Sequence, residues 1–99
     1  GLTQEAAASV RALGIYLAAL PGSQIRIVGH TDSQGAAAAN QSLSERRAQQ
    51  IRATLAAAGV ARDRISASGV GAAQPIADNG TAAGRAKNRR VETSSLNFS

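Results

Sequence analysis

The stretch QIRIVGHTDSQG, residues 24–35, joins a strand pattern directly to a polar segment. Ile25 and Ile27 occupy alternate positions, and the β-branched side chains around them favour a strand over residues 24–29. Asp32 then comes just past the expected carboxyl end of that strand. Because ligands of open α/β sheets tend to sit outside such strand ends, Asp32 is the first candidate for a binding residue.

On the N-terminal side, residues 3–20 predict an amphipathic helix, because apolar residues recur at spacings of three and four. Thr3 is the expected N-cap of this helix. The dipeptide at residues 21–22, Pro-Gly, stops the helix and turns the chain toward the strand. The predicted buried stripe consists of Val10, Leu13, Leu17 and Leu20.

On the C-terminal side, residues 30–39 predict a loop of polar and small residues. Ser42 and Glu45 have the spacing of a capping box and predict that a second helix begins at Ser42. Gly59 stands where a left-handed C-terminal glycine would end that helix. The predicted buried stripe consists of Ala48, Ile51, Leu55 and Ala58.

A short strand is expected over residues 64–69, with Ile65 and Ala67 on one face. The resulting strand–helix–strand order predicts a parallel strand pair with a right-handed crossover. A glycine-rich loop, one or two helical turns over residues 81–87 and a last strand over residues 90–98 complete the chain.

The composition narrows the class of protein. Ninety-nine residues are the size of one domain, which we expect to span residues 1–99. The absence of cysteine excludes disulfides, thiol nucleophiles and thiolate metal sites. No apolar run reaches membrane-spanning length and no signal peptide pattern occurs, so an exported protein of this sequence would be a mature piece. Ten of the 11 basic residues are arginine and the net charge is +5, which favours an anionic partner or surface.

Three polar residues are expected to converge near the start of the second helix. Asp32 follows the strand, Asn40 precedes the helix, and Arg47 lies in its early turns. A helix N-terminus already favours an anion through its free N–H groups and dipole. A site with one fixed anion and one fixed cation suits a zwitterion, with Asp32 holding an ammonium and Arg47 a carboxylate.

Several motifs in order make the sequence resemble the OmpA-like family. They are GHTD at residues 29–32 with Gly35 three residues on, Asn40, the pair Leu43-Ser44, the pair Arg47-Ala48, and NRRVE at residues 88–92. The resemblance covers residues 2–92 and implies an α/β sandwich of β-α-β-α-β type, with a small mixed sheet and two main helices on one face. Members usually begin with a Phe-rich strand, which this chain lacks.

The resemblance also implies a function. Members bind peptidoglycan of the meso-diaminopimelate type without cleaving it, in the periplasm, and anchor the outer membrane or a membrane complex to the cell wall. No cofactor, metal or nucleic acid is expected, and a membrane tether upstream of residue 1 is consistent with the family. The residues that would contact diaminopimelate are Asp32, Asn40, Arg47, Thr31, Arg89 and Arg90, with either of the last two arginines open as the contact. The supporting residues are Gly29, His30, Gly35, Leu43, Ser44 and Asn88.

Two other functions remain as alternatives. The basic run at residues 85–90 would suit nucleic acid, but single-strand binders need stacking aromatics and only Tyr16 and Phe98 are present. A cell-wall hydrolase could use His30 and Asp32, but no third orienting group is evident. We therefore expect His30 to be structural, bonding its loop.

Overall fold

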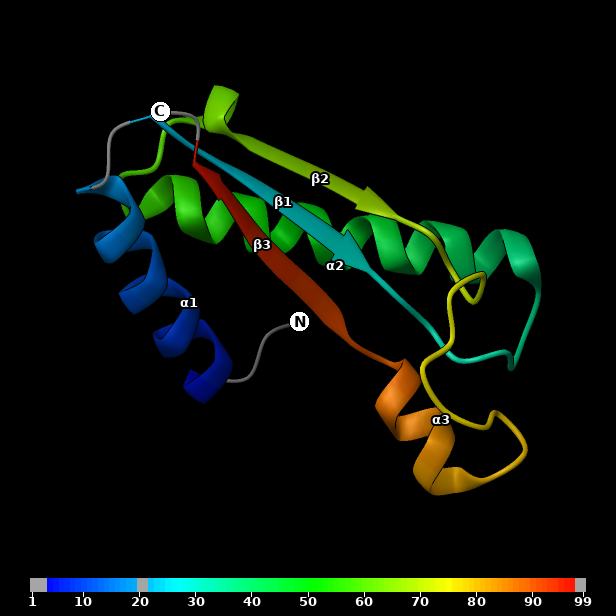
Figure 1. Ribbon diagram of the computed structural model, residues 1–99. Helices are drawn as coiled ribbons and strands as arrows, with labels where there is room; N and C mark the ends of the chain where they lie inside the picture. Colours follow the sequence, from blue (N-terminus) through cyan, green and yellow to red (C-terminus); the bar gives the residue numbers. More distant parts are fainter. Residues whose placement is uncertain (1–3, 20–21, 98–99) are drawn as a thin grey trace.

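The computed structural model describes residues 4–19 and 22–97 of the chain. Helices and strands alternate along it, and the strands lie side by side in one sheet (Figure 1). Among the described residues, no helix has both the length and the apolar character needed to cross a membrane. The elements are α1 (Gln4–Ala18), β1 (Ser23–Gly29), α2 (Ala37–Ala57), the 3-10 turn η1 (Arg62–Arg64), β2 (Ile65–Gly69), α3 (Ala82–Asn88) and β3 (Val91–Asn97).

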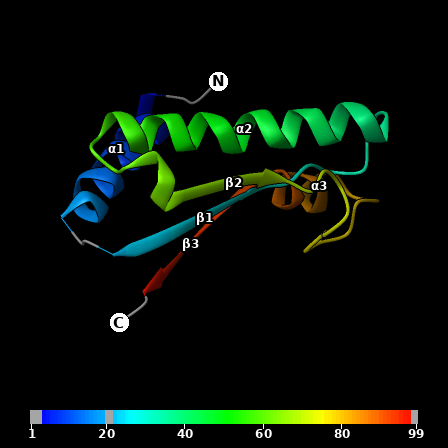
Figure 2. The ribbon, with the colours of Figure 1, turned by 90° about the horizontal axis from the view of Figure 1, so that it is seen from above.

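The sheet is mixed and has the order β2-β1-β3. β1 and β2 are parallel, as the strand–helix–strand order predicted, whereas β3 runs antiparallel to β1. The central residue Ile27 is therefore paired with Ala67 on one side and Thr93 on the other. Helices α1 and α2 lie on the same face of the sheet (Figure 2), which confirms the predicted α/β fold.

The core lies between this face and the two helices. β1 contributes Ile25 and Ile27, whose alternation was the basis for predicting the strand. The α2 stripe is confirmed except for Ala58, which is only half-buried at the helix end. Among the described residues, the buried core side chains are all aliphatic. The members of the core are Leu17, Ile25, Ile27, Ala48, Ile51, Leu55, Val60 and Ile65.

The predicted α1 stripe is wrong in part. Leu13 is 37% exposed, and Gly14 is buried in its place against α2. A Cβ on Gly14 would lie 2.7 Å from the Cβ of Ala58, so the two helices approach more closely than a leucine side chain would allow. The predicted positions of Val10 and Leu17 are confirmed, because both pack in or against the core, while the predicted Thr3 and Leu20 fall outside the described residues.

Helix α2 begins at Ala37, not at Ser42, so the predicted loop over residues 30–39 is too long and the capping box is wrong. Alanine has the highest intrinsic helix propensity, and the run at residues 36–39 extends the helix by more than a turn. No side chain caps this end. At the other end Gly59 has a φ of +113°, which confirms the predicted left-handed glycine after the helix.

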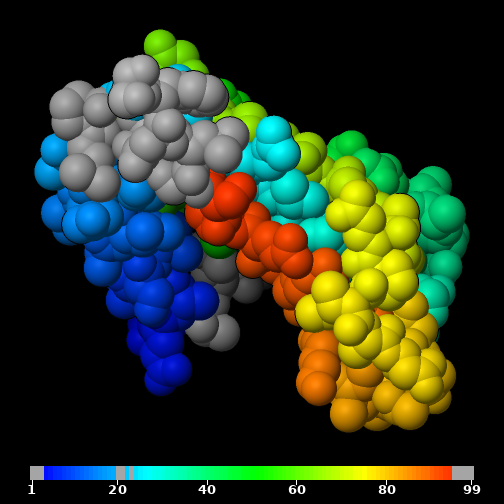
Figure 3. Space-filling model, in the orientation of Figure 1, coloured from blue at the N-terminus to red at the C-terminus, as the bar shows by residue number. Residues whose placement is uncertain are grey.

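The outer edge of β3 pairs with no strand among the described residues. Figure 3 shows α1 and α3 as two separate lobes on either side of β3. The β3 edge is the edge of the sheet opposite β2. Helix α3 lies near this edge, beside the carboxyl end of β1 (Figure 1).

Candidate functional site

Asp32 lies just beyond the carboxyl end of β1 and is only 7% exposed. Its Oδ1 accepts the backbone N–H of Gln34 at 2.9 Å, and its Oδ2 accepts Nη1 of Arg89 at 2.8 Å. The backbone hydrogen bond from Gln34 is the main cause that lowers the pKa of Asp32 below its ordinary value, and the Arg89 bond adds to it. The carboxylate is therefore ionised at neutral pH and accepts hydrogen bonds only.

The loop that carries Asp32 is held by side chains at both ends. Thr31 is buried, donates its backbone N–H to the Gly71 carbonyl at 2.9 Å, and donates Oγ1 to the Asp32 carbonyl at 2.9 Å. Asn40 donates Nδ2 to the carbonyls of Gln34 at 2.9 Å and Asp32 at 3.4 Å. The amide nitrogen of Asn40 thus organises the loop, and it does so from inside the first turns of α2.

Close backbone contacts fix α2 against the ends of two strands. Gly29 and Gly69 are register partners at the carboxyl ends of β1 and β2. A Cβ on Gly29 would overlap the Ser44 carbonyl, and a Cβ on Gly69 would overlap the Glu45 backbone nitrogen. Ser44 is fully buried there, donates Oγ to the Gln41 carbonyl at 2.9 Å and accepts the Gly71 N–H at 3.0 Å.

This contact was missed from the sequence. Gly29 and Ser44 were named as supporting residues through the family resemblance, but Gly69 and Gly71 were not. The available signal was the glycine that ends both predicted parallel strands. Glycines at matching strand ends indicate that another backbone approaches both strands at that point.

Arg47 is in the middle of α2 and not in its early turns, because the helix begins at Ala37. The argument from the helix dipole therefore does not reach it. Its side chain is half-buried and forms no hydrogen bond or ion pair with any described residue. It borders a hollow of about 330 Å³ together with Leu43, Arg46 and Gln50, and Asp32 is not among the lining residues. That Asp32 and Arg47 contact one ligand stays a prediction.

The two neighbouring arginines have different roles. Arg89 pairs with Asp32 and keeps a side chain that is 46% exposed. Arg90 is only 16% exposed, because it bonds to the Gln74 carbonyl at 3.1 Å and to Glu92 at 2.7 Å. In the basic run, Arg85 also donates to the Asn79 carbonyl at 3.0 Å. Three of the four basic side chains in this run thus bond within the fold, while Lys87 and Arg89 stay exposed.

Asn88 is the organiser of the loop before α3. It is fully buried, and its Oδ1 accepts the backbone N–H groups of Ile76 at 2.8 Å and Ala77 at 3.0 Å. Its Nδ2 donates to the Ala77 carbonyl at 3.0 Å and to Oδ1 of Asn79 at 2.7 Å. Because Arg89 follows directly in the chain, these bonds also fix the start of the segment that reaches Asp32.

His30 is buried, as a structural residue would be, but its ring does not bond the loop as predicted. Neither ring nitrogen has a hydrogen-bond partner in the described structure, and Nε2 lies 3.7 Å from Oε1 of Glu92. Burial is the main cause that lowers the pKa of His30 below its ordinary value; the charge of Arg90 adds to this, and Glu92 opposes it. No hydrogen bond joins His30 to Asp32, so the acid–base pair of the hydrolase alternative is not formed.

Metal binding has no evident site in this part of the chain. Across residues 4–19 and 22–97, no three His, Cys, Asp or Glu side chains cluster in a way that could hold an ion. The charged and polar groups at the loop that follows β1 are Asp32, Asn40 and Arg89.

Comparison with known proteins places this geometry in a family. The family model described as the OmpA family matches residues 1–89. The chain is 49% identical over 85 residues to outer membrane porin F of Pseudomonas fluorescens, covering 86% of this chain and 26% of that protein. It is 47% identical over 76 residues to peptidoglycan-binding protein ArfA of Mycobacterium tuberculosis, covering 77% of this chain and 23% of that protein.

A solved structure shows the same fold. The peptidoglycan-associated lipoprotein of Burkholderia pseudomallei superposes with a TM-score of 0.91 at 28% identity, over 97% of this chain and 81% of that one. The chain spans about a quarter of the length of the two relatives above, at 26% and 23%. On the match over residues 1–89, together with the shared fold, the chain belongs to the OmpA family.

Proposed function

We propose that this chain binds peptidoglycan non-covalently by the free end of diaminopimelate, the stem-peptide residue that carries both an ammonium and a carboxylate at its tip. The observation that carries the proposal is Asp32, the one buried carboxylate among the described residues, held ionised at the end of β1. One relative is named for peptidoglycan binding, and the superposed lipoprotein is named for its association with peptidoglycan.

The ammonium would be bound by Asp32. A carboxylate offers about four lone-pair positions, and the Gln34 N–H and the Arg89 guanidinium use two of them. The remaining positions leave room for a charge-assisted hydrogen bond from an ammonium. Arg89 would thus share Asp32 with the ligand without being displaced.

The carboxylate would be bound by Arg47, with Arg89 beside it. Arg47 has no competing partner in the described structure and lies seven residues after Asn40, on the same side of α2. Helical side chains point back toward the helix N-terminus, which directs the Arg47 guanidinium toward the Asn40 turn. Of the two arginines that the sequence left open, Arg89 suits ligand contact because Arg90 is held by Gln74 and Glu92.

This arrangement would discriminate between stem peptides. Lysine carries the ammonium but lacks the second carboxylate, so a lysine-type stem would leave Arg47 without a partner in a partly desolvated site. Each charge-assisted contact nets roughly 1.5–3 kcal/mol, and two or three of them imply a single-site constant of about micromolar to millimolar. A polymer that repeats the ligand turns such contacts into firm attachment. We place this anchoring role in the periplasm, with the parent protein attached to the outer membrane or cell envelope.

Co-sedimentation with insoluble peptidoglycan tests the proposal. Asp32→Asn and Arg47→Gln each remove one charge and should lower the bound fraction at least tenfold on diaminopimelate-type wall. The matched controls are Asp63→Asn and Arg11→Gln, which remove the same charges at exposed positions on η1 and α1. If the site variants sediment like the controls, the site assignment is wrong; equal binding of the wild type to lysine-type wall would contradict the selectivity.

A further inference from the structure

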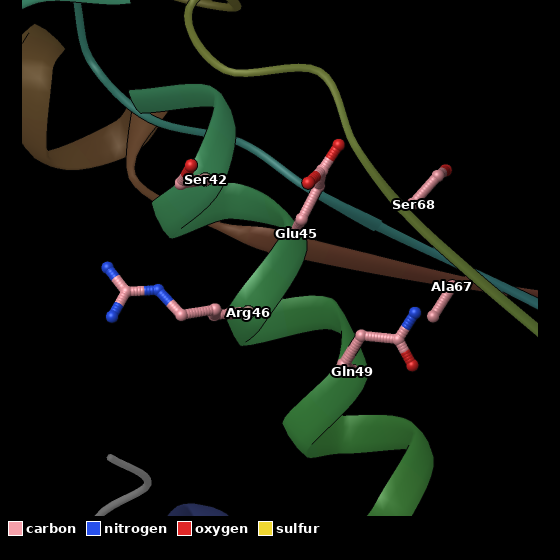
Figure 4. A pocket seen from close by; sticks show the side chains of 6 residues that line it. All are labelled: Ser42, Glu45, Arg46, Gln49, Ala67 and Ser68. Carbon is pink, nitrogen blue, oxygen red and sulfur yellow. The ribbon is translucent and has the colours of Figure 1, made fainter. Parts of the chain in front are cut away.

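A second hollow, with both polar and apolar walls, lies between α2 and the outer strand of the sheet. β2 is at the edge of the sheet, and the space between it and α2 has a volume of about 580 Å³. This slot lies next to the hollow beside Arg47 around the circumference of α2, and Arg46 lines both of them. The slot is lined by Ser42, Glu45, Arg46, Gln49, Ala67 and Ser68 (Figure 4).

One pair of backbone groups of β2 faces this slot. In a parallel ladder, the N–H and C=O of every second residue point to the same neighbouring strand. Val70 donates to the Gly29 carbonyl on β1, whereas the Gly69 carbonyl accepts from Gln41 on the outer side. By this alternation the N–H and C=O of Ala67 point outward, away from β1, at the edge where Ala67 lines the slot.

Side chains close the slot at both ends. Gln41 reaches from α2 to the Gly69 carbonyl, and Arg52 reaches from α2 to the Arg62 carbonyl at 3.1 Å. A long peptide strand therefore cannot pair along the whole edge of β2, since the carbonyl of Gly69 at its carboxyl end is already covered. The free N–H and C=O of Ala67 can pair with a single amide group of a ligand. They cannot support the row of hydrogen bonds that a continuous polypeptide strand would make.

The walls define the chemistry of that ligand. Glu45 and Gln49 reach toward β2, whereas Arg46 points away from it (Figure 4). Glu45 uses Oε1 to accept from Gln41 at 3.0 Å, which leaves Oε2 available. The carboxylate of Glu45, the amide of Gln49 and the backbone N–H and C=O of Ala67 border the same space and favour a neutral ligand rich in hydroxyl groups, whereas the Ser68 hydroxyl lies on the other face of the sheet. An anion would meet Glu45, and an apolar ligand would leave these groups unpaired.

We propose that this slot binds the N-acetylated hexosamine backbone of the glycan strand, with an acetamido group at Ala67 and sugar hydroxyls at Glu45 and Gln49. The inference rests on the proposed function, because it assigns a second part of the same polymer to the neighbouring flank of α2. Each contact is neutral or singly charged, so the single-site constant is about millimolar. Its effect appears on the polymer, where stem peptide and glycan are linked and the two sites reinforce each other.

An NMR titration of the chain with triacetylchitotriose, which contains no stem peptide, tests the assignment. The amide signals of Ala67 and Ser68 and the side-chain amide of Gln49 should shift, and cellotriose, which lacks acetamido groups, should bind at least fivefold more weakly. Glu45→Ala and Gln49→Ala should each raise the dissociation constant at least fivefold. Gln24→Ala, an exposed glutamine on β1, is the matched control and should leave it unchanged.

A second titration separates this inference from the proposed function. Asp32→Asn should abolish binding of a diaminopimelate-containing stem tripeptide and leave chitotriose binding unchanged, while Glu45→Ala should do the reverse. Loss of tripeptide binding in Glu45→Ala, or chitotriose shifts that map to Asp32 and Arg89 and spare Ala67, would overturn the glycan slot alone. Shifts at Ala67 on adding the tripeptide would reassign the slot to peptide.

Discussion

The two halves of α2 are held against the rest of the fold in different ways. The N-terminal half is fixed by backbone contact and buried polar atoms, with Ser44 packed against Gly29. The C-terminal half is held by aliphatic packing, with Leu55 fully buried in the core and Gly14 of α1 against its end. Backbone contacts cannot adjust by changing a rotamer, whereas aliphatic side chains can. The half that carries the candidate site is therefore the half whose position is most strictly set.

Gly29→Ala should produce the largest effect, because the added Cβ would overlap the Ser44 carbonyl and force α2 off the sheet. We expect a loss of about 4 kcal/mol or more in the free energy of unfolding, which approaches the whole stability of a small domain. Urea unfolding followed by circular dichroism measures it.

Gly14→Ala is the matched control at the other half. Its Cβ would lie 2.7 Å from the Ala58 Cβ, which has no other rotamer, so α1 must move away from the end of α2. Alanine also gains about 1 kcal/mol of helix propensity over glycine. The net change should therefore be a loss of about 0–2 kcal/mol, well below that of Gly29→Ala. Equal destabilisation by the two substitutions would remove the distinction between the halves.

Leu55→Ala should cost about 2–5 kcal/mol, the range for emptying a buried leucine site. The lost packing lies in the C-terminal half of α2, away from the candidate site. The molecules that stay folded should therefore bind peptidoglycan with unchanged affinity. Combined urea unfolding and co-sedimentation at a temperature where the variant is folded measure both quantities. A binding loss larger than the unfolded fraction explains would show that the aliphatic half also shapes the site.

Asn88→Ala should cost less, about 1–3 kcal/mol, because it leaves buried N–H and C=O groups of the loop at residues 76–79 unpaired. Its effect should be local. Hydrogen exchange should accelerate at Ile76 and Ala77, and peptidoglycan binding should weaken through the displaced Arg89, while exchange in the C-terminal half of α2 stays slow. Uniform acceleration across α2 would contradict this separation.

Features set by neighbouring residues in the chain could be predicted from the sequence. β1 was predicted because Ile25 and Ile27 alternate, and the end of α2 because Gly59 is a local signal. The predicted start of α2 is wrong because the capping-box spacing of Ser42 and Glu45 indicates a start at Ser42. The alanines before it have a high helix propensity, and they extend the helix back to Ala37. The capping-box spacing and the alanine run are both local signals, and in this chain the helix propensity of alanine is the stronger one.

The site was harder to predict because its geometry depends on residues far apart in the chain. The bond from Arg89 to Asp32 spans 57 positions, and no periodicity indicates which of two adjacent arginines makes it. Likewise, the burial of Gly14 in place of Leu13 follows from how closely α1 approaches α2. Motifs identified the residues of the site, but only packing determines their directions.

The smallest effect should come from His30, a buried titratable group beside the polar half of the fold. Because its folded pKa lies below the ordinary value of 6.5, the unfolded chain takes up a proton first as the pH falls. Stability should therefore be constant near pH 7–8 and fall below about pH 6.5, with a slope of at most about 1.4 kcal/mol per pH unit for one proton. Two carboxylates near His30 do not interfere in this window. A hydrogen bond from Gln34 lowers the pKa of Asp32 below its ordinary value of 3.8, and one from Arg90 lowers the pKa of Glu92 below 4.5. The stability that these two ionised groups contribute is therefore lost only at lower pH. Urea midpoints between about pH 5 and 8 measure the slope, and His30→Gln, which removes the chain's single histidine, should flatten it. A wild-type midpoint that rises toward pH 5 would mean that Glu92 at 3.7 Å stabilises the protonated ring more than burial penalises it.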